Sequence, residues 1–434
     1  MADTRVWYPY TQMRGLEPPL EMVRGEGAWL EARDGRRYLD AISSWWVTLH
    51  GHAHPRIAAA VARQAAQLEQ VILAGCTHPG AERLAERLLA VAPPGLAHVF
   101  YSDDGSTAVE VALKMALQSA QQRGEGQRRT IVALEHAYHG DTLGAMAVSA
   151  PSAFTAAFAD LLFPAARVPT AYCHRCPVGK QRASCAIDCL APLERLLERE
   201  GEQVAAVIVE PLLQGAGGMI VQPPEFLAGM RKLCDRHGAL LIADEVLTGF
   251  GRTGTMFACE QAGVTPDILC LSKGLTGGFL PLAATLCTEA VYAAFLAEDR
   301  RRTLFHGHSF TGNALGCAAA LASLEVFATE PVMARIAAIA ATHTRRLARL
   351  RGHARVADAR QAGTVAALEL AEREPGYLAA VGPRLRDHCL RQGVLLRPLG
   401  HIVYVLPPYC IQPEELEWVW DVIEAGLESV GAEA

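Results

Sequence analysis

Short apolar runs that end in a polar or charged residue alternate with amphipathic stretches through the middle of the chain. The run at 239–243 stops at Asp244, and the run at 268–271 leads into Lys273. Apolar residues at every position of a short run are typical of strands that are buried on both faces of a parallel sheet. Because such runs alternate with helical patterns, we predict an α/β fold with a doubly wound, mainly parallel sheet.

Three of the predicted strands end in a side chain that can carry chemistry, namely Glu210, Asp244 and Lys273. The C-terminal ends of parallel strands share one edge of the sheet, and ligands of open α/β sheets bind at that edge. A lysine and an aspartate that meet there suit pyridoxal phosphate, because its aldehyde needs an amine to form a Schiff base and its pyridine nitrogen needs a carboxylate to stay protonated. The alternative interpretation is an ordinary salt bridge between two strand ends.

A small polar turn at 103–107 lies between a predicted strand at 98–102 and a strong helical pattern. Such a turn favours phosphate binding, because the free N–H groups and the dipole of a helix N-terminus both attract anions. Gly105 and Ser106 are the candidates, although Ser106 or Thr107 could serve only as the N-cap of the helix.

A second polar loop follows the predicted strand at 130–135. Tyr138 of this loop could lie flat against an aromatic cofactor ring. The spacing His136-x-x-His139-x-Asp141 also resembles a set of metal ligands, but an isolated pair of histidines lacks the further ligands and the regular spacing of zinc sites. We therefore expect no metal in this loop.

The two ends of the chain differ from its middle. Residues 1–50 contain four of the six tryptophans and alternate apolar with polar positions around Asp34-Gly35, which is a hairpin signal. Beyond residue 324 an arginine-rich amphipathic helix and short strands predict a small α+β unit. We therefore predict a large domain at 51–324 and a small domain at 325–434, to which residues 1–50 contribute.

Aromatic and arginine residues in these end segments have two interpretations. Trp45 and Trp46 could pack an interface between subdomains, or they could wall a pocket. Arg397 lies near the end of a predicted C-terminal strand. Its guanidinium could face solvent or could bind a carboxylate through two parallel hydrogen bonds.

Composition excludes several classes of function. The chain has 434 residues, of which 51% are hydrophobic, so it can bury a large core. Its formal net charge of −6 provides no basic surface for nucleic acid. The first residues lack the apolar core of a signal peptide, and no later segment reaches the length of a membrane span. We expect a cytoplasmic protein that binds neither nucleic acid nor a membrane.

Twelve cysteines in such a chain are better interpreted as free thiols or metal ligands than as disulfides. Two close pairs, Cys173 with Cys176 and Cys185 with Cys189, could close a tetrahedral Zn²⁺ shell. Free cysteines are also often small buried apolar residues, and the two pairs are closer together than in the commonest zinc ribbons, so we predict no metal. The segment 249–254 matches G-x-G-x-x-G, but no long helix follows it, and we reject a dinucleotide site.

Six segments carry a more specific signal, and they are, in chain order, SDDGSTAVEVALKMA, HAYHGDT, VEPLLQGAGGM, LLIADEVLTGFGRTG, LSKGLTGG and HSFTGNALGCAAA. In this combination they resemble the fold type I, class III (omega) pyridoxal-phosphate aminotransferases over nearly the whole chain. The resemblance implies a large domain with a mainly parallel sheet, a small α+β domain, and pyridoxal 5'-phosphate as cofactor. It also implies a ping-pong transamination of small-molecule substrates.

The resemblance assigns roles to residues at matching positions. Lys273 would be the catalytic Schiff-base lysine, Asp244 the partner of the pyridinium nitrogen, and Tyr138 the residue that stacks on the ring. Gly105 and Ser106 would bind the cofactor phosphate. The residues expected around the cofactor are Lys273, Asp244, Gly105, Ser106, Tyr138, Glu210 and Ser309.

The resemblance further implies a substrate pocket, with Tyr10 as a second catalytic residue. The expected pocket residues are Tyr10, Trp45, Trp46, Tyr138, Asp141, Arg252, Lys273, Gly307, Arg397 and Tyr404. The loop at 307–309 is expected to reach the cofactor phosphate of a neighbouring subunit, so that a homodimer shares its active sites. His308 of this loop departs from the rigid proline that we expect at this position.

Within the family, the segments at 9–13, 45–46 and 397–409 look most like the branch that moves an amino group from S-adenosylmethionine to 8-amino-7-oxononanoate in biotin biosynthesis. Alternatives are omega-aminotransferases of 4-aminobutyrate, ornithine or β-alanine, and an enzyme that makes the same product with lysine as donor. An aminomutase would use the same lysine to move nitrogen within one molecule. A ligand-sensing regulator would carry a DNA-binding module, for which the chain shows no basic appendage.

Overall fold

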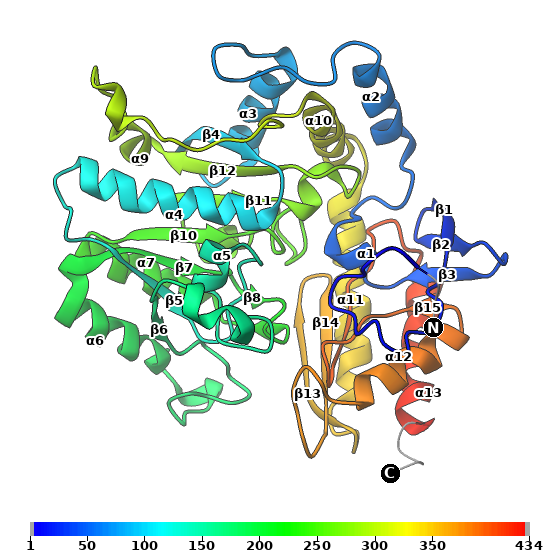
Figure 1. Ribbon diagram of the computed structural model, residues 1–434. Helices are drawn as coiled ribbons and strands as arrows, with labels where there is room; N and C mark the ends of the chain where they lie inside the picture. Colours follow the sequence, from blue (N-terminus) through cyan, green and yellow to red (C-terminus); the bar gives the residue numbers. More distant parts are fainter. Residues whose placement is uncertain (1–3, 430–434) are drawn as a thin grey trace.

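A seven-stranded sheet forms the centre of the larger part of the molecule (Figure 1). The computed structural model describes residues 4–429. Within this sheet only β12 runs against its neighbours, so the predicted mainly parallel sheet is confirmed. The strands in spatial order are β4 (Leu96–Ser102), β12 (Ala283–Thr288), β11 (Ile268–Leu271), β10 (Leu240–Asp244), β7 (Val204–Val209), β5 (Thr130–Leu134) and β6 (Ala166–Val168).

Alternate residues of these strands face two different cores. Ile242 of β10 packs in the core that contains helix α4 (Gly105–Gln122), whereas Leu241 packs in the core that contains helix α7 (Pro224–His237). In Figure 1 α4 crosses in front of the sheet, and α7 also packs against β10. Because both faces are covered, apolar residues occupy every position of the strand, and the doubly wound arrangement is confirmed.

The strand register brings the predicted strand-end residues to one edge. Strands β10 and β11 are parallel, with Asp244 opposite Cys270, so Lys273 follows at the same edge. Strand β7 pairs in parallel with the other side of β10 and leads directly into Glu210. The lysine and the two carboxylates therefore share the C-terminal edge of the sheet, as the sequence predicts.

Further helices surround the sheet. The elements are α2 (Pro55–Ala65), α3 (Pro79–Val91), α5 (Leu143–Val148), α6 (Ala191–Glu200), α8 (Ala258–Gln261), α9 (Glu289–Ala293), α10 (Ala314–Thr329) and the short strands β8 (Leu213–Gln214) and β9 (Ile220–Val221).

Two small sheets lie beside the larger part, together with the last three helices (Figure 1). The hairpin predicted at Asp34-Gly35 joins β2 to β3. Strand β3 also pairs with β15, so the N-terminal segment shares a sheet with the C-terminal part of the chain. The elements are β1 (Met22–Glu26), β2 (Trp29–Ala32), β3 (Arg37–Asp40), β13 (Val356–Ala362), β14 (Val365–Leu370), β15 (Val394–Leu395), β16 (Ile402–Val405), α11 (Val332–Leu350), α12 (Val381–Arg391) and α13 (Pro413–Ser429).

The predicted domain boundary at residue 324 lies inside the continuous helix α10, and a bend of 77° separates α10 from α11. The division into two domains stays a prediction. Between residues 4 and 429, no single helix is long and apolar enough to cross a membrane. The bent pair of α10 and α11 reaches that length and composition only in combination, and much of α10 is buried in the core.

Candidate active site

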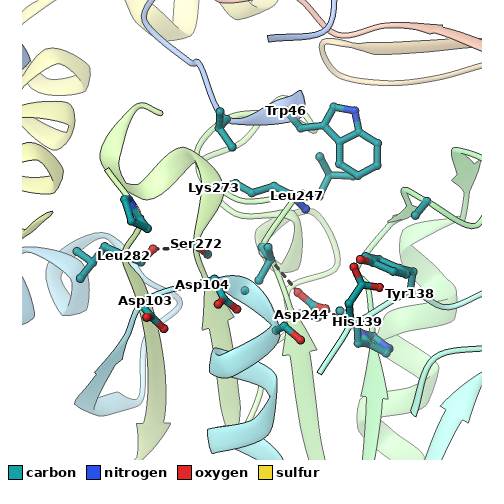
Figure 2. A pocket seen from close by; sticks show the side chains of 18 of the residues that line it. Trp46, Asp103, Asp104, Tyr138, His139, Asp244, Leu247, Ser272, Lys273 and Leu282 are labelled. Atoms are coloured by element: carbon teal, nitrogen blue, oxygen red, sulfur yellow. Dashed lines mark hydrogen bonds and ion pairs between the residues drawn. The ribbon is translucent and has the colours of Figure 1, made fainter. Parts of the chain in front are cut away.

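A cavity of about 650 Å³ opens at the C-terminal edge of the sheet. Figure 2 shows Lys273 on one side of it and Asp244 on another, with Tyr138 and His139 beside the carboxylate. The strand ends, the start of α4 and the loop after β5 all contribute to its lining. Of the residues predicted around a cofactor, the cavity is lined by Gly105, Ser106, Tyr138, Glu210, Asp244 and Lys273.

Lys273 is the first residue of a short 3-10 turn, η5 (Lys273–Thr276), and its φ of 42° is in the left-handed region. Non-glycine residues with this conformation cluster at functional sites, because the surrounding fold must hold the strain. The chain has four lysines, and the other three are exposed on the surface. Burial lowers the pKa of Lys273, although the nearby charges of Asp244 and Glu210 partly raise it. A lowered pKa makes the amine available as a nucleophile and as a base.

Asp244 is held by two hydrogen bonds. Its Oδ2 lies 2.7 Å from Nδ1 of His139, and its Oδ1 accepts the backbone N–H of Val246 at 3.1 Å. The carboxylate is nearly buried, with 5% of the residue exposed. The rival interpretation, a salt bridge with Lys273, is not what the structure contains, because the ion-pair partner of Asp244 among the described residues is His139.

Glu210 is also buried and lies where the loop after β5 meets the loop after β8. Its two carboxylate oxygens accept the backbone N–H groups of Tyr138 and Gly215, each at 2.9 Å. Burial raises the pKa of Glu210 to about 7, and the neighbouring charge of Asp244 adds to the effect. Glu210 therefore positions Tyr138 through its backbone, and its ionisation falls near neutral pH.

Replacement of Glu210 by glutamine is expected to flatten the pH dependence of stability. The folded protein holds the Glu210 proton more tightly than the unfolded chain, so the free energy of unfolding falls as pH rises from 4.5 to about 7. The contribution is about 3 kcal/mol at 1.36 kcal/mol per pH unit. Urea titrations of cofactor-free wild type and Glu210→Gln at pH 5 and 8 measure the difference. Glu194→Gln on the surface is the control, and equal pH dependence in wild type and Glu210→Gln would contradict the expectation.

The start of α4 provides a site for an anion. The first helical N–H groups, those of Gly105 and Ser106, have no acceptor within the helix and face the cavity. Asp104 is the N-cap and accepts the N–H of Thr107 at 2.9 Å, so the alternative role of Ser106 or Thr107 as the N-cap is wrong. A Cβ at position 105 would approach Val246 Cγ1 to 2.5 Å, so only glycine fits there.

One loop of five residues connects these parts. Tyr138 and His139 reach Glu210 and Asp244, and Thr142 donates its N–H to Ser106 Oγ at 3.0 Å. Gly140 has a φ of 133°, and a Cβ there would approach Ser106 Oγ to 2.2 Å. The loop from 138 to 142 therefore ties the carboxylates at the sheet edge to the anion site at the helix.

Trp45 and Trp46 lie on a short turn, α1 (Ser43–Trp46), whose four residues all have positive φ. Hydrogen bonds from Ser43 Oγ to Leu406 O and from Ser44 Oγ to Asp40, each 2.8 Å, hold the turn. The ring of Trp46 lies 4.9 Å from Lys273 Nζ.

Each of the two indoles also contacts another residue predicted to line the substrate pocket. The indole N–H of Trp46 donates to the Tyr404 hydroxyl at 3.0 Å. The Trp45 ring lies 5.5 Å from the ring of Tyr10. The turn therefore links the predicted aromatic pocket residues to one another, and of these four only Trp46 lines the cavity beside the lysine.

Tyr10 lies on the segment before β1, is not among the residues that line the cavity, and contacts two residues of the 138–142 loop that do. Its hydroxyl donates to the Asp141 carboxylate and lies 3.3 Å from the hydroxyl of Tyr138. Burial and the Asp141 hydrogen bond raise the pKa of Tyr10 to about 12. At neutral pH Tyr10 therefore keeps its proton and acts as a hydrogen-bond donor.

The two arginines predicted to bind a substrate carboxylate have different surroundings. Arg252 is 1% exposed, does not line the cavity, and donates to the carbonyl groups of Pro407 at 3.0 Å and Trp46 at 3.3 Å. In this structure it supports the tryptophan turn. Arg397 does not line the cavity either; it stacks on Trp45 at 4.1 Å and has no hydrogen bond or ion pair with any residue in the range 4–429. Arg397 is therefore the arginine that is free to bind a carboxylate.

Gly307 and Ser309 do not line the cavity of their own chain, although their loop reaches Asp103, which does. The backbone carbonyl of Ser309 accepts the side-chain amide of Gln70 at 2.8 Å, and His308 Nε2 lies 3.7 Å from Asp103 Oδ1. The neighbouring Phe305 and Phe310 are exposed. Their exposure is consistent with a contact to another chain, and the roles of Gly307 and Ser309 stay predictions.

The four cysteines of the 173–189 segment line one small void of about 10 Å³. Across the described part of the chain, no three His, Cys, Asp or Glu side chains lie close enough together to hold a metal ion. All twelve cysteines are free thiols. The structure therefore gives no support to the zinc alternative for Cys173, Cys176, Cys185 and Cys189.

Sequence patterns miss several residues of the site. Thr142 and Leu247 line the cavity and lie within two of the quoted family segments, but no role is assigned to them, and His139 is considered only as a rejected metal ligand. Phe154 packs edge-to-face on Tyr10 at 5.5 Å from a segment without a recognisable pattern. The available signal is that His139 and Thr142 share a segment with Tyr138, and Leu247 shares one with Asp244.

Comparison with known proteins agrees with this geometry. The family model "Aminotransferase class-III" matches residues 10–427. An adenosylmethionine-8-amino-7-oxononanoate aminotransferase of Geobacter sulfurreducens is 47% identical over 434 residues, which cover 98% of this chain and 96% of the relative. A protein of the same name from Synechococcus elongatus is 47% identical over 432 residues, with coverage of 99% and 100%.

Solved structures give the same picture. The adenosylmethionine-8-amino-7-oxononanoate aminotransferase of Methanocaldococcus jannaschii superposes with a TM-score of 0.92 at 37% identity, covering 98% of this chain and 97% of the other. An amine transaminase from an uncultivated Pseudomonas species, solved in its pyridoxal-phosphate-bound form, has a TM-score of 0.94 at 33% identity, with coverage of 99% and 100%. The chain therefore belongs to the class III aminotransferases, which are enzymes that depend on pyridoxal phosphate.

Proposed function

We propose that this enzyme transfers an amino group from S-adenosylmethionine to 8-amino-7-oxononanoate and so forms 7,8-diaminononanoate for biotin. The observation that carries the proposal is the near full-length similarity, at 47% identity, to aminotransferases named for these two substrates. A cavity lined by Lys273, the buried Asp244 and the rings of Trp46 and Tyr138 supports it.

The residues of the cavity fit pyridoxal phosphate. Lys273 supplies an amine with a lowered pKa, and Asp244 supplies a buried carboxylate. The N-terminus of α4 supplies an anion site, where only glycine fits at positions 105 and 140. When bound, the cofactor supplies an electron sink that stabilises negative charge at the substrate carbon. Lys273 Nζ would hold the cofactor aldehyde, Asp244 its pyridine nitrogen, and Ser106 its phosphate.

Lys273 then has a second role as acid and base. Once the amine of the donor has displaced Lys273 from the aldehyde, the freed Nζ would take the proton from the substrate carbon and return it on the cofactor side, which requires an amine that is partly neutral near pH 7. Burial lowers the pKa of Lys273 in that direction. Tyr10, whose hydroxyl keeps its proton, would orient substrate at the mouth of the cavity.

One pocket must accept two different substrates in alternate half-reactions. Both carry a carboxylate, for which Arg397 is the free cation. The aromatic wall of Trp45, Trp46 and Tyr10 suits the long alkyl chain of the oxononanoate. It also suits a sulfonium donor, because ring faces attract cations.

Donor identity is tested by half-reactions. Purified holoenzyme is mixed separately with S-adenosylmethionine, lysine, 4-aminobutyrate, ornithine and β-alanine, and the visible absorbance of the bound cofactor is followed. We expect S-adenosylmethionine to convert the aldehyde form to the amine form, and 8-amino-7-oxononanoate to reverse the change. A response to lysine alone, or only to 4-aminobutyrate or ornithine, would replace the proposal by the corresponding alternative.

We further propose that the enzyme is a cytoplasmic homodimer with active sites at the subunit interface. Its support is the loop at 307–309, which lies outside the cavity of its own chain beside two exposed phenylalanines. By its resemblance to the family, this loop would reach the phosphate of a neighbouring subunit. Ser309 would supply its hydroxyl there, and His308 would take the place of a rigid proline.

A further inference from the structure

His139 is held both by its ring and by its backbone. Its Nδ1 lies 2.7 Å from Oδ2 of Asp244, and the residue is 3% exposed. Its backbone N–H donates to Ser149 Oγ at 2.9 Å, and that hydroxyl in turn donates to the carbonyl of Ala145 at 2.9 Å. Figure 2 shows the imidazole beside the Asp244 carboxylate, at the edge of the cavity.

The hydrogen-bond partners identify the tautomer. An ionised carboxylate only accepts hydrogen bonds, so Nδ1 carries the proton and donates it to Asp244. The other nitrogen, Nε2, is buried and has no partner among residues 4–429. A proton on Nε2 would be a buried donor without an acceptor among these residues, which is costly.

The contact restricts Asp244 to one orientation. Val246 N–H binds Oδ1 and His139 binds Oδ2, so both oxygens are anchored on the protein side. Hydrogen bonds to a buried carboxylate also offset part of the cost of burying its charge. The other charged groups near the pair are Glu210, which interacts with both partners, and Lys273, which interacts with Asp244.

We propose that His139 is a positioning residue that holds the Asp244 carboxylate against the pyridine nitrogen of the cofactor. The proposal rests on the cofactor assignment given above but not on the choice of amino donor. A histidine that only filled space in the core would not need an N–H at this point. A substitution that removes the N–H group but keeps the side-chain volume therefore distinguishes a positioning role from simple packing.

The test compares His139→Asn with His139→Leu. The asparagine amide nitrogen stands three bonds from Cα, as Nδ1 of histidine does, so it can donate to Asp244, whereas leucine fills the space without a donor. His343→Leu is the control, because His343 is equally buried and hydrogen-bonded but lies in helix α11 away from the cavity. Cofactor release after gel filtration, the pH titration of the visible absorbance, and unfolding by urea are measured for each holoenzyme.

We expect His139→Leu to release cofactor about tenfold faster or more, since a lost hydrogen bond to a charged group has roughly that effect. The midpoint of its absorbance titration should move as well, while His139→Asn stays within about threefold of wild type. His343→Leu should change only the urea midpoint. The proposal would be overturned if His139→Leu released cofactor and titrated its visible absorbance as wild type does. It would also be overturned if the leucine and asparagine variants behaved alike.

The donor experiment is independent of this outcome. If S-adenosylmethionine fails as donor while His139→Leu still loses cofactor, only the substrate assignment falls. If the donor works and His139→Leu holds cofactor as wild type does, only the positioning role falls. A wild-type protein that binds no pyridoxal phosphate would refute both.

Discussion

Lys273→Ala is expected to abolish turnover, with a loss of at least about 10⁴-fold. Lys273 has two roles in the proposed mechanism, because the same amine holds the cofactor aldehyde and moves the proton. No other side chain can replace it, since the remaining lysines of the chain, Lys114, Lys180 and Lys232, are on the surface. The visible absorbance of the purified protein should change to that of cofactor without a covalent link.

The measurement is a steady-state assay together with the absorbance spectrum and mass of the protein after borohydride reduction. Reduction should fix the cofactor to the wild type and leave Lys273→Ala unmodified. Lys232→Ala, an exposed change on α7, is the matched control and should behave as wild type. Full activity in Lys273→Ala would show that another group carries the amine chemistry.

The fold was predictable because its strands are buried on both faces. Runs such as 239–243 and 268–271 are apolar at every position, which leaves few alternatives to a parallel sheet with helices on both sides. The order of these strands along the sheet is not encoded in the runs themselves. Once β10 pairs with β7 and β11, however, the three residues at the strand ends must meet at one edge.

Side-chain direction was harder to predict, because it depends on local backbone twists that the patterns do not reveal. Trp45 and Trp46 lie on a turn with positive φ at every residue. Glycine or asparagine usually marks such a conformation in a sequence, and this turn contains neither. The same turn explains why Arg252 does not point into the cavity. Its guanidinium is bound by the carbonyl groups of Trp46 and Pro407, so a residue that matches a substrate arginine by position supports the pocket wall instead.

Contacts between distant segments account for the rest. His139 and Asp244 are 105 residues apart, and Tyr10 and Asp141 are 131 residues apart. No periodicity in one segment specifies a partner at such a distance, whereas the strand register and the 138–142 loop bring these residues together. The sequence therefore indicates which chemical groups are available, and packing decides which of them act together.

Asp244→Asn is expected to lower kcat by about 10²–10³-fold, the range typical for loss of one preorganised electrostatic contact. Asparagine has nearly the same shape, and its oxygen can still accept the Nδ1–H of His139. It carries no charge, however, so it cannot keep the pyridine nitrogen protonated, and the electron sink weakens. The protein should stay folded and should still bind cofactor through Lys273 and the α4 N-terminus.

Single-turnover kinetics with S-adenosylmethionine separate this effect from weaker substrate binding. The rate at saturating donor should fall while the half-saturating concentration changes by less than about threefold, because Asp244 would touch the cofactor and not the substrate. Asp235→Asn removes an exposed carboxylate paired with Arg231 and should leave both constants unchanged. A cofactor analogue with carbon in place of the pyridine nitrogen gives a second control. With that analogue Asp244→Asn and wild type should be equally slow, and a large remaining difference between them would mean that Asp244 acts on something other than the ring nitrogen.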